Sequence, residues 1–188
     1  PTIFLADELG RPYAQTGYQP GGAESYVSHL AELRGKRAER DKELEAAARA
    51  EGAEKAKHLA AALEVVGEEL ALSAYADQVR ELIAADANNE AGLKGKYEQK
   101  LADAEFDKAI SKLVSAFNGK NGGEVLAAFD EAAEKYKPSP ARILQATLNY
   151  KLHFLIGAGK NEEALALIDK LLADGEQEPM AKLQLGLA

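Results

Sequence analysis

The sequence of 188 residues contains no cysteine and no tryptophan, and it has fewer basic than acidic residues. Without thiols the chain forms no disulfide, thiolate nucleophile or cysteine-ligated zinc site of its own. With 23 Lys and Arg against 31 Asp and Glu, the formal charge is −8, so no overall positive field attracts nucleic acid or anionic lipid. No apolar run approaches the roughly 20 residues that cross a bilayer. These absences argue against nucleic-acid binding and a membrane span.

The residues that are present suit one globular domain or two small ones. The sequence is 46% hydrophobic and 29% charged, which is enough apolar material for a buried core. It starts at Pro1, directly inside an apolar, β-like run. We therefore expect it to be part of a longer gene product.

The first segment predicts a β-hairpin followed by a helix. A strand is expected from Thr2 to Leu5, and the turn ends at Gly10, which tolerates positive φ. The return strand is expected from about Pro12 to Gly17. A loop then leads to a helix from Ala23, in which Tyr26, Val27, Leu30 and Leu33 share one face.

This order resembles the C-terminal half of a thioredoxin-like domain, from Pro1-Thr2 to about Arg34. The resemblance implies that Pro1, in a cis bond, and Thr2 contact an extended peptide substrate. It places the redox cysteines upstream, so a longer parent that supplies them would be a thiol-disulfide oxidoreductase. It also implies an extracytoplasmic location, periplasmic or envelope, with the cytoplasm as the alternative. Alternatively, Pro1 simply starts a strand, where its missing N–H costs nothing.

The next segment, residues 35–66, is expected to hold connecting helices. Its first half consists of strong helix formers with interleaved charges, which favours a solvated helix over a coiled coil. Arg34, Lys36, Arg37 and Arg40 form a basic cluster, but neighbouring acidic residues dilute it. We predict no anion site there.

Residues 67–188 are expected to form an antiparallel helical body. The apolar spacing after Gly52 is helical, and breaks are predicted at residues 86–89, 118–123 and 137–140. Short connections between helices imply antiparallel neighbours.

Within this body, two segments resemble the second helix of a tetratricopeptide-like repeat. Residues 105–109 echo residues 160–164, and each segment ends in a small residue, Ala109 or Ala164, where two helices are expected to approach closely. The echoes lie 55 residues apart rather than about 34, so a plain helical bundle is the alternative. A similar helical extension follows the thioredoxin-like domain in some uncharacterised bacterial proteins.

Motifs for metal or cofactor chemistry are weak. His29, His58 and His153 lie on three different predicted helices, without a second ligand at helical spacing. The segment from Asp86 to Glu90 has Ala91 at the sixth position and lacks the Glu that ends a calcium loop, which predicts a turn capped by Asp86 or Asn89. Seven aromatic residues could line a peptide groove, but their helical spacing favours the core: Tyr97, Phe106, Phe117, Phe129, Tyr136, Tyr150 and Phe154. We predict no catalytic residue, no metal and no cofactor.

The sequence thus predicts a mainly α fold, with an N-terminal hairpin and helix in residues 1–34 followed by the helical segments. The favoured function is a non-catalytic segment of a thioredoxin-like protein, whose helical extension contacts a protein or peptide partner. The alternative is a free-standing tetratricopeptide-like scaffold that binds peptides. Self-association through the edge of the strand from Thr2 to Leu5 is a further prediction.

Overall fold

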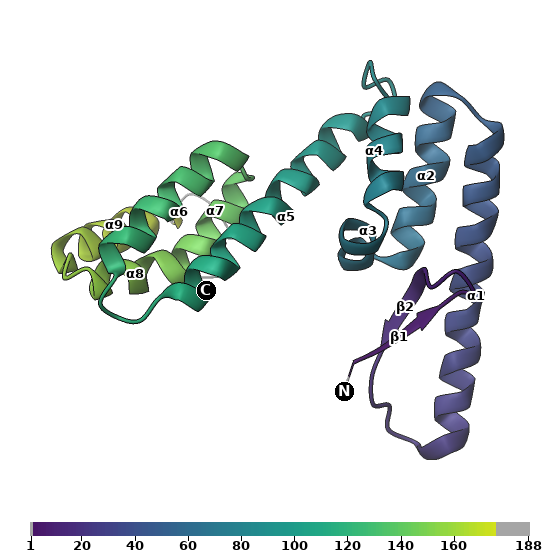
Figure 1. The fold of residues 1–188 in the computed structure, drawn as a ribbon, viewed down its shortest axis with the longest axis horizontal. Helices are drawn as coiled ribbons and strands as arrows, with labels where there is room; N and C mark the ends of the chain where they lie inside the picture. The colour runs from purple at the N-terminus through teal and green to yellow at the C-terminus, as the bar shows by residue number, and fades with distance from the viewer. Residues whose placement is uncertain (1, 176–188) are drawn as a thin grey trace. The chain divides into compact units, whose positions relative to one another are not determined.

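The computed structural model describes residues 2–175 (Figure 1). It confirms a mainly helical chain with an antiparallel two-stranded hairpin at its N-terminus. The chain divides into two compact units, Pro1–Leu101 and Ala102–Ala188, here called unit 1 and unit 2. No helix among the described residues is long and apolar enough to cross a membrane.

Unit 1 begins with the hairpin of β1 (Ile3–Ala6) and β2 (Pro12–Thr16). Ile3 lies opposite Thr16 and Leu5 opposite Ala14, and the register shifts between Leu5 and Ala6. Gly10 adopts φ 76° in the connecting turn, a conformation that favours glycine. Leu5 and the β2 residues Tyr13 and Ala14 pack against Leu33 in a small apolar cluster of their own. The bounds of both strands lie within one residue of those that the sequence predicts.

A single helix, α1 (Gly22–Arg49), follows and runs without a break through the predicted boundary at residue 34. It packs along α2 and also contacts β2 (Figure 1). The expectation of a solvated connecting helix is wrong for its inner face, where Leu33, Arg40 and Ala47 are buried. The local sequence does not predict this buried face, because its largest residue, Arg40, is charged. Charged residues are rarely buried unless they are paired, and two partners of Arg40 lie far away in the sequence.

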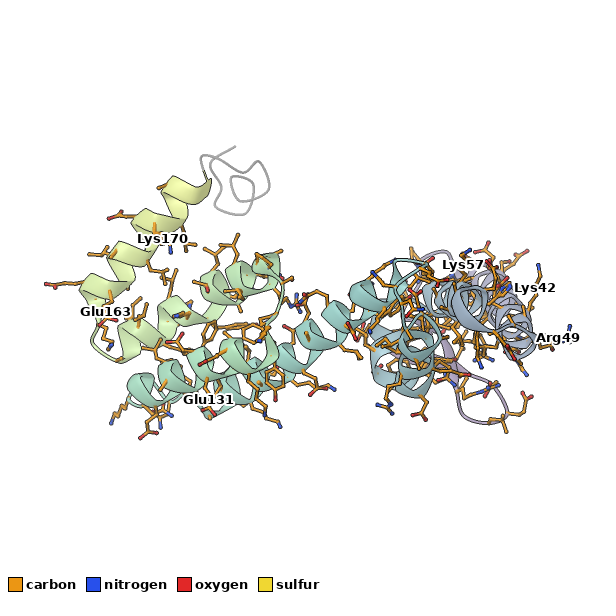
Figure 2. All side chains as sticks on the ribbon, turned by 90° about the horizontal axis from the view of Figure 1, so that it is seen from above. Lys42, Arg49, Lys57, Glu131, Glu163 and Lys170 are labelled. Carbon is orange, nitrogen blue, oxygen red and sulfur yellow. The ribbon has the colours of Figure 1, made fainter. Side chains whose placement is uncertain are left out.

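The main core of unit 1 lies between α1, α2 (Gly52–Val66), α3 (Glu68–Ala74), α4 (Ala76–Ala85) and the first turns of α5 (Leu93–Ala116). Leu59, Leu63, Val79, Leu82 and Tyr97 are each at most 3% exposed. Their spacing is the helical spacing that the sequence shows. Charged side chains such as Lys42, Arg49 and Lys57 point outward instead (Figure 2).

The predicted cap between α4 and α5 is confirmed. Asp86 is buried, and its carboxylate accepts hydrogen bonds from the backbone N–H groups of Ala91, Leu93 and Lys94. Asn89 adds a bond from the N–H of Gly95. These acceptors satisfy donors that the first turn of α5 leaves without helical partners.

Unit 2 contains the rest of α5, α6 (Gly122–Tyr136), α7 (Pro140–Ala146), the π-helical segment η1 (Thr147–Lys151), α8 (Leu152–Gly157) and α9 (Asn161–Gly175). The breaks predicted at residues 118–123 and 137–140 coincide with the connections from α5 to α6 and from α6 to α7, and each extends into the start of the following helix. Phe106 from α5, Phe129 from α6 and Phe154 from α8 meet in its core with Ala164 from α9. The rings of Phe106 and Phe129 pack edge to face, with centroids 5.7 Å apart.

Helices α6 and α8 approach closely at Gly122. A Cβ atom on this residue would lie 2.3 Å from the backbone nitrogen of Ala158 and 2.5 Å from the carbonyl oxygen of Phe154. Only glycine fits without a shift of α8. Ala164 is buried, as its predicted role requires, whereas Ala109 is only half-buried.

One aromatic residue departs from the predicted core. Tyr97, Phe106, Phe129 and Phe154 are buried and Phe117 and Tyr136 are half-buried, but Tyr150 is 37% exposed. Tyr150 lies in η1, where the wider helical turn changes the direction of each side chain. The regular 3.6-residue spacing assumed for this segment therefore assigns Tyr150 to the wrong face.

Candidate interaction groove

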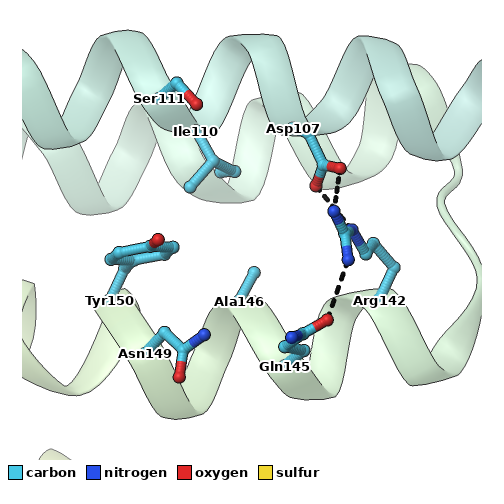
Figure 3. Close-up of a pocket in the computed structure, with 8 residues that line it drawn as sticks. All are labelled: Asp107, Ile110, Ser111, Arg142, Gln145, Ala146, Asn149 and Tyr150. Carbon is cyan, nitrogen blue, oxygen red and sulfur yellow. Dashed lines mark hydrogen bonds and ion pairs between the residues drawn. The ribbon is translucent and has the colours of Figure 1, made fainter. Parts of the chain in front are cut away.

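A groove of about 330 Å³ lies in unit 2, between α5 on one side and α7 with η1 on the other (Figure 3). Ligand pockets usually have volumes of about 300–1,000 Å³, so this one is at the small end of that range. Its walls are mostly polar and its floor is apolar. The lining residues are Asp107, Ile110, Ser111, Arg142, Gln145, Ala146, Asn149 and Tyr150.

One end of this α5–α7 groove is closed by an ion pair between α5 and α7. Arg142 Nε donates to Asp107 Oδ1 at 2.6 Å, and Arg142 Nη2 pairs with the second oxygen of the same carboxylate. Arg142 Nη1 also donates to Gln145 Oε1 at 2.8 Å. This two-point contact orients the guanidinium and sets the position of the Gln145 side chain (Figure 3).

The start of α7 is anchored to α5 by a second contact. Ser139 donates from its backbone N–H to Asp103 Oδ1 at 2.6 Å and from its hydroxyl to Asp103 Oδ2 at 2.8 Å. Its hydroxyl oxygen accepts a bond from the N–H of Arg142, which caps the helix. The two sides of the groove are therefore held together before any ligand binds.

Side chains with both donors and acceptors line the middle of the groove. Gln145 and Asn149 are four residues apart, and each carboxamide has an acceptor oxygen and a donor nitrogen. Ile110 and Ala146 face one another between the helices, and the ring of Tyr150 lies at the other end (Figure 3). A peptide backbone carries the complementary donors and acceptors.

The π-helical segment η1 supplies Asn149 and Tyr150. Such segments are rare and occur frequently at functional sites, because they turn side chains away from the ordinary helical faces. Sequence reasoning did not find this site, because no local pattern distinguishes a π turn from an α turn.

A second groove, of about 590 Å³, lies on the other side of α5, against α6. Asp107 and Ser111 border both grooves. Ala109, Leu113, Ala128 and Tyr136 give the second groove an apolar lining. The two grooves therefore lie on opposite sides of α5 and share Asp107 and Ser111.

The structure leaves the predicted peptide contacts near the N-terminus largely unassigned. Pro1 lies outside the described residues, and Thr2 is exposed just before β1. Thr2 is thus accessible, and its proposed contact with a peptide stays a prediction.

The three histidines lie at separate places. His29 Nε2 is 2.7 Å from Thr16 Oγ1, and His58 Nδ1 is 2.8 Å from Glu43 Oε2, while His153 is exposed on α8. Within residues 2–175 no group of three or more His, Asp or Glu side chains is arranged to hold a metal ion.

Unit 1 also contains a buried polar cluster that sequence reasoning missed. Arg40 is fully buried and donates to Asp7 Oδ2 at 2.9 Å, to Tyr75 Oη at 2.6 Å and to Asp41 Oδ1 at 2.6 Å. The Tyr75 hydroxyl in turn donates to the carbonyl of Pro12 at 2.7 Å. This cluster joins the hairpin to α1 and to Tyr75, the residue between α3 and α4. We interpret it as structural.

The pKa values of this cluster follow from its hydrogen bonds. Burial tends to raise the pKa of Asp7, but bonds from Arg11, the N–H of Leu9 and Arg40 outweigh it and hold that pKa far below the ordinary 3.8. Burial tends to lower the pKa of Arg40, and its contacts with Tyr75 and Asp41 raise it overall. Both groups are therefore charged at neutral pH.

Two other groups in unit 1 have shifted pKa values. The backbone N–H of Ala91, with those of Leu93 and Lys94, lowers the pKa of Asp86 against the opposing effect of burial. Burial, together with nearby Glu64 and Glu68, raises the pKa of Tyr97 to about 12. Both groups stabilise the fold and do not line the groove.

Comparisons with the models of known protein families, with curated proteins and with solved structures found no match to this chain. The α5–α7 groove is therefore interpreted from its own residues.

Proposed function

We propose that unit 2 is a protein-interaction module that binds an extended peptide segment of a partner in the α5–α7 groove. The observation that carries this proposal is the pair of carboxamides, Gln145 and Asn149, placed beside an apolar floor. Carboxamides recognise backbone N–H and C=O groups, so they bind an extended chain largely independently of its sequence. The apolar floor adds a preference for a small or aliphatic side chain at one position.

The module fits both interpretations of the whole chain. In the first, the chain is a non-catalytic segment of a thioredoxin-like protein, and unit 2 belongs to its helical extension. In the second, it is a tetratricopeptide-like scaffold that acts alone. Because the sequence has no cysteine, neither version performs thiol exchange with these residues. A Cys-x-x-Cys pair in a longer parent protein would favour the first.

The peptide proposal is tested by selecting binders from a library of random peptides displayed on phage, with the whole chain as target. The enriched peptides are then titrated against purified variants. We expect Gln145→Ala combined with Asn149→Ala to weaken binding about tenfold or more, which is ~1.4 kcal/mol. Glu131→Ala, on the exposed face of α6, is the matched control and should leave affinity unchanged (Figure 2).

Two outcomes would overturn the proposal. One is that the selection enriches no peptide above the background of an unrelated target. The other is that enriched peptides bind the double variant as tightly as the original chain. Circular dichroism of each variant verifies that the helices remain folded.

A second candidate function, self-association, is supported by the free edge of β1. The hairpin is the only sheet within the described residues, so β1 pairs with β2 on one side alone. Ile3 is 37% and Phe4 is 56% exposed, and no charged residue lies within the strand. An unprotected apolar edge is a template for another strand.

Self-association is tested by sedimentation equilibrium over a wide range of concentrations. If β1 pairs with a second copy, Phe4→Lys should weaken association, because a charge at the edge opposes pairing. Leu9→Lys changes a residue in the turn, outside β1, that is exposed even more than Phe4, and is the control. A chain that stays monomeric at high concentration would rule this candidate out.

A further inference from the structure

The loop between α5 and α6 contains two Asn-Gly pairs that the structure holds in very different ways. Asn118 precedes Gly119, and Asn121 precedes Gly122. In an Asn-Gly pair, the backbone nitrogen of glycine can attack the side-chain amide of asparagine, because glycine has no side chain to obstruct the approach. Sequence alone treats the two pairs as equivalent.

At Asn118 the side-chain carbonyl is already polarised. Its Oδ1 accepts hydrogen bonds from the backbone N–H of Lys120 at 3.0 Å and of Asn121 at 3.2 Å. When a nucleophile attacks Cγ, negative charge develops on this same oxygen, and two N–H donors stabilise it as in an oxyanion hole. These bonds also keep the side chain folded back over the backbone that follows it.

The rest of the Asn118 site is open. Asn118 and Gly119 are exposed, and a Cβ atom on Gly119 would meet no atom within 4 Å. Within residues 2–175 the Asn118 Nδ2 group has no hydrogen-bond partner. Water and base can therefore reach the reacting atoms, and the leaving nitrogen is not restrained.

At Asn121 the same atoms are restrained. Its Oδ1 accepts the N–H of Asn118 at 3.1 Å, and its Nδ2 donates to the carbonyl of Ala116 at 3.0 Å. Its backbone carbonyl accepts bonds from the first turn of α6, at Glu124 and Val125. Ring closure requires the peptide group between residues 121 and 122 to rotate, and these bonds oppose that rotation.

Packing also opposes rotation of the peptide group between Asn121 and Gly122. Gly122 is buried against the backbone of α8, where even one added carbon atom would clash. The nitrogen that would act as nucleophile therefore cannot move toward the Asn121 side chain without displacing α8.

We propose that Asn118 is a site of spontaneous deamidation in the folded protein and that Asn121 is protected from it. The Gly119 nitrogen loses its proton to base and forms a bond to Cγ of Asn118, and the bond from Cγ to Nδ2 breaks. Nδ2 leaves as ammonia, and a five-membered succinimide remains. Water then opens one of the two ring C–N bonds, which gives either aspartate or isoaspartate, with no change of oxidation state.

The product alters the connection between α5 and α6. Aspartate adds a negative charge to the loop, and isoaspartate also inserts one carbon atom into the main chain beside Phe117. The ring of Phe117 lies against Gly157 and packs with Phe154 of α8. The modification is therefore placed where it can act on the packing of unit 2, and it is not reversed by simple hydrolysis.

The experiment uses the whole chain and follows both asparagines in one sample. Cleavage after Lys112, Lys120 and Lys135 separates residues 113–120, which contain Asn118, from residues 121–135, which contain Asn121. Native chain is incubated at mildly alkaline pH, digested at intervals and analysed by mass spectrometry for conversion of amide to carboxylate. A sample taken at time zero measures deamidation during digestion.

A parallel incubation in concentrated guanidinium chloride supplies the reference, because both Asn-Gly pairs are then free of structure. We expect similar rates at both sites in the unfolded chain and a rate at Asn118 about tenfold or more above that at Asn121 in the native chain. Labelling by an isoaspartyl methyltransferase should appear in the 113–120 peptide. Equal native rates would overturn the proposal, and so would a native chain in which neither site reacts.

Discussion

Arg40 Nη1 donates a hydrogen bond to Tyr75 Oη at 2.6 Å, although 35 residues separate them. The same guanidinium is paired with Asp7, and both side chains are inaccessible to solvent. Removing one partner of a buried ion pair costs about 3–5 kcal/mol. Without Arg40, the only arginine paired with Asp7 among the described residues would be Arg11, whose side chain is partly exposed. The stability of unit 1 therefore depends on Arg40 more than on any surface arginine.

We predict that Arg40→Met lowers the free energy of unfolding by about 3–5 kcal/mol. Arg49→Met, on the exposed end of the same helix, is the matched control and should change it by less than about 1 kcal/mol. Urea unfolding followed by circular dichroism measures both. Equal midpoints for the two variants would mean that the buried cluster contributes little.

Asp7 should make the protein sensitive to acid. Because its folded pKa is below the ordinary 3.8, the unfolded chain binds this proton at a higher pH than the folded chain does. The contribution is present above about pH 4 and is lost as the pH falls toward the lowered folded pKa. Asp7→Asn should therefore be less stable than the original chain at neutral pH, with a difference that shrinks in acid.

Urea midpoints measured between neutral pH and about pH 3 test this prediction. Asp77→Asn replaces an exposed carboxylate and serves as the control. Asp86, whose pKa is also lowered, contributes in the same direction in every variant. A constant difference between the original chain and Asp7→Asn across this range would contradict the assignment.

Two adjacent glycines should respond in opposite ways to alanine. In Gly122→Ala the new Cβ atom meets the backbone of α8, and such overpacking costs typically about 1–3 kcal/mol. In Gly123→Ala the new atom meets nothing within 4 Å, so the variant should be unchanged or up to about 1 kcal/mol more stable, because alanine favours helix. Thermal unfolding of both variants tests the contact between α6 and α8. If both variants unfold at the same temperature, that contact is absent in solution.

Leucine substitutions should distinguish the two small residues predicted at close helix contacts. Ala164 lies in the core of unit 2, so Ala164→Leu should cost about 1–3 kcal/mol. Ala109 borders the groove against α6, and Ala109→Leu has room to extend into it at a lower cost. Denaturant midpoints that are unchanged by both substitutions would show that neither face is packed.

The chain should have no thiol-disulfide activity, because the thiolate that performs the exchange is missing from its sequence. Reduction of insulin by dithiothreitol should proceed at the same rate with and without the protein. A rate above that of the buffer would contradict this expectation. A longer parent protein that carries a cysteine pair should show the activity.

Much of the fold could be predicted because its helices follow apolar spacing and its breaks contain Gly, Asn and Pro. Leu59, Leu63 and Val66 are buried on one face of α2, as their spacing indicates. The predicted strand limits also agree with the observed ones to within one residue, because Gly10 and Pro12 mark the turn. These signals are local and act within a few residues.

The α5–α7 groove and the buried cluster depend on contacts that local patterns do not encode. Arg40 belongs to a basic segment, and its burial depends on partners that lie far away in the sequence, Asp7 at 33 residues and Tyr75 at 35. The spacing of an ordinary helix predicts a core position for Tyr150, whereas this residue lies in η1 and is 37% exposed. Val27 shows the same limit, since it shares a predicted apolar face with Leu33 but is 65% exposed.

Helix α1 has 28 residues, so it is about 42 Å long. Arg40 lies in the second half of this helix, yet its buried carboxylate partner, Asp7, belongs to the hairpin. A recombination event that joined this helix to a different hairpin would have to supply a new carboxylate at the same place. The two segments are therefore expected to be inherited as one piece, even though they differ in secondary structure.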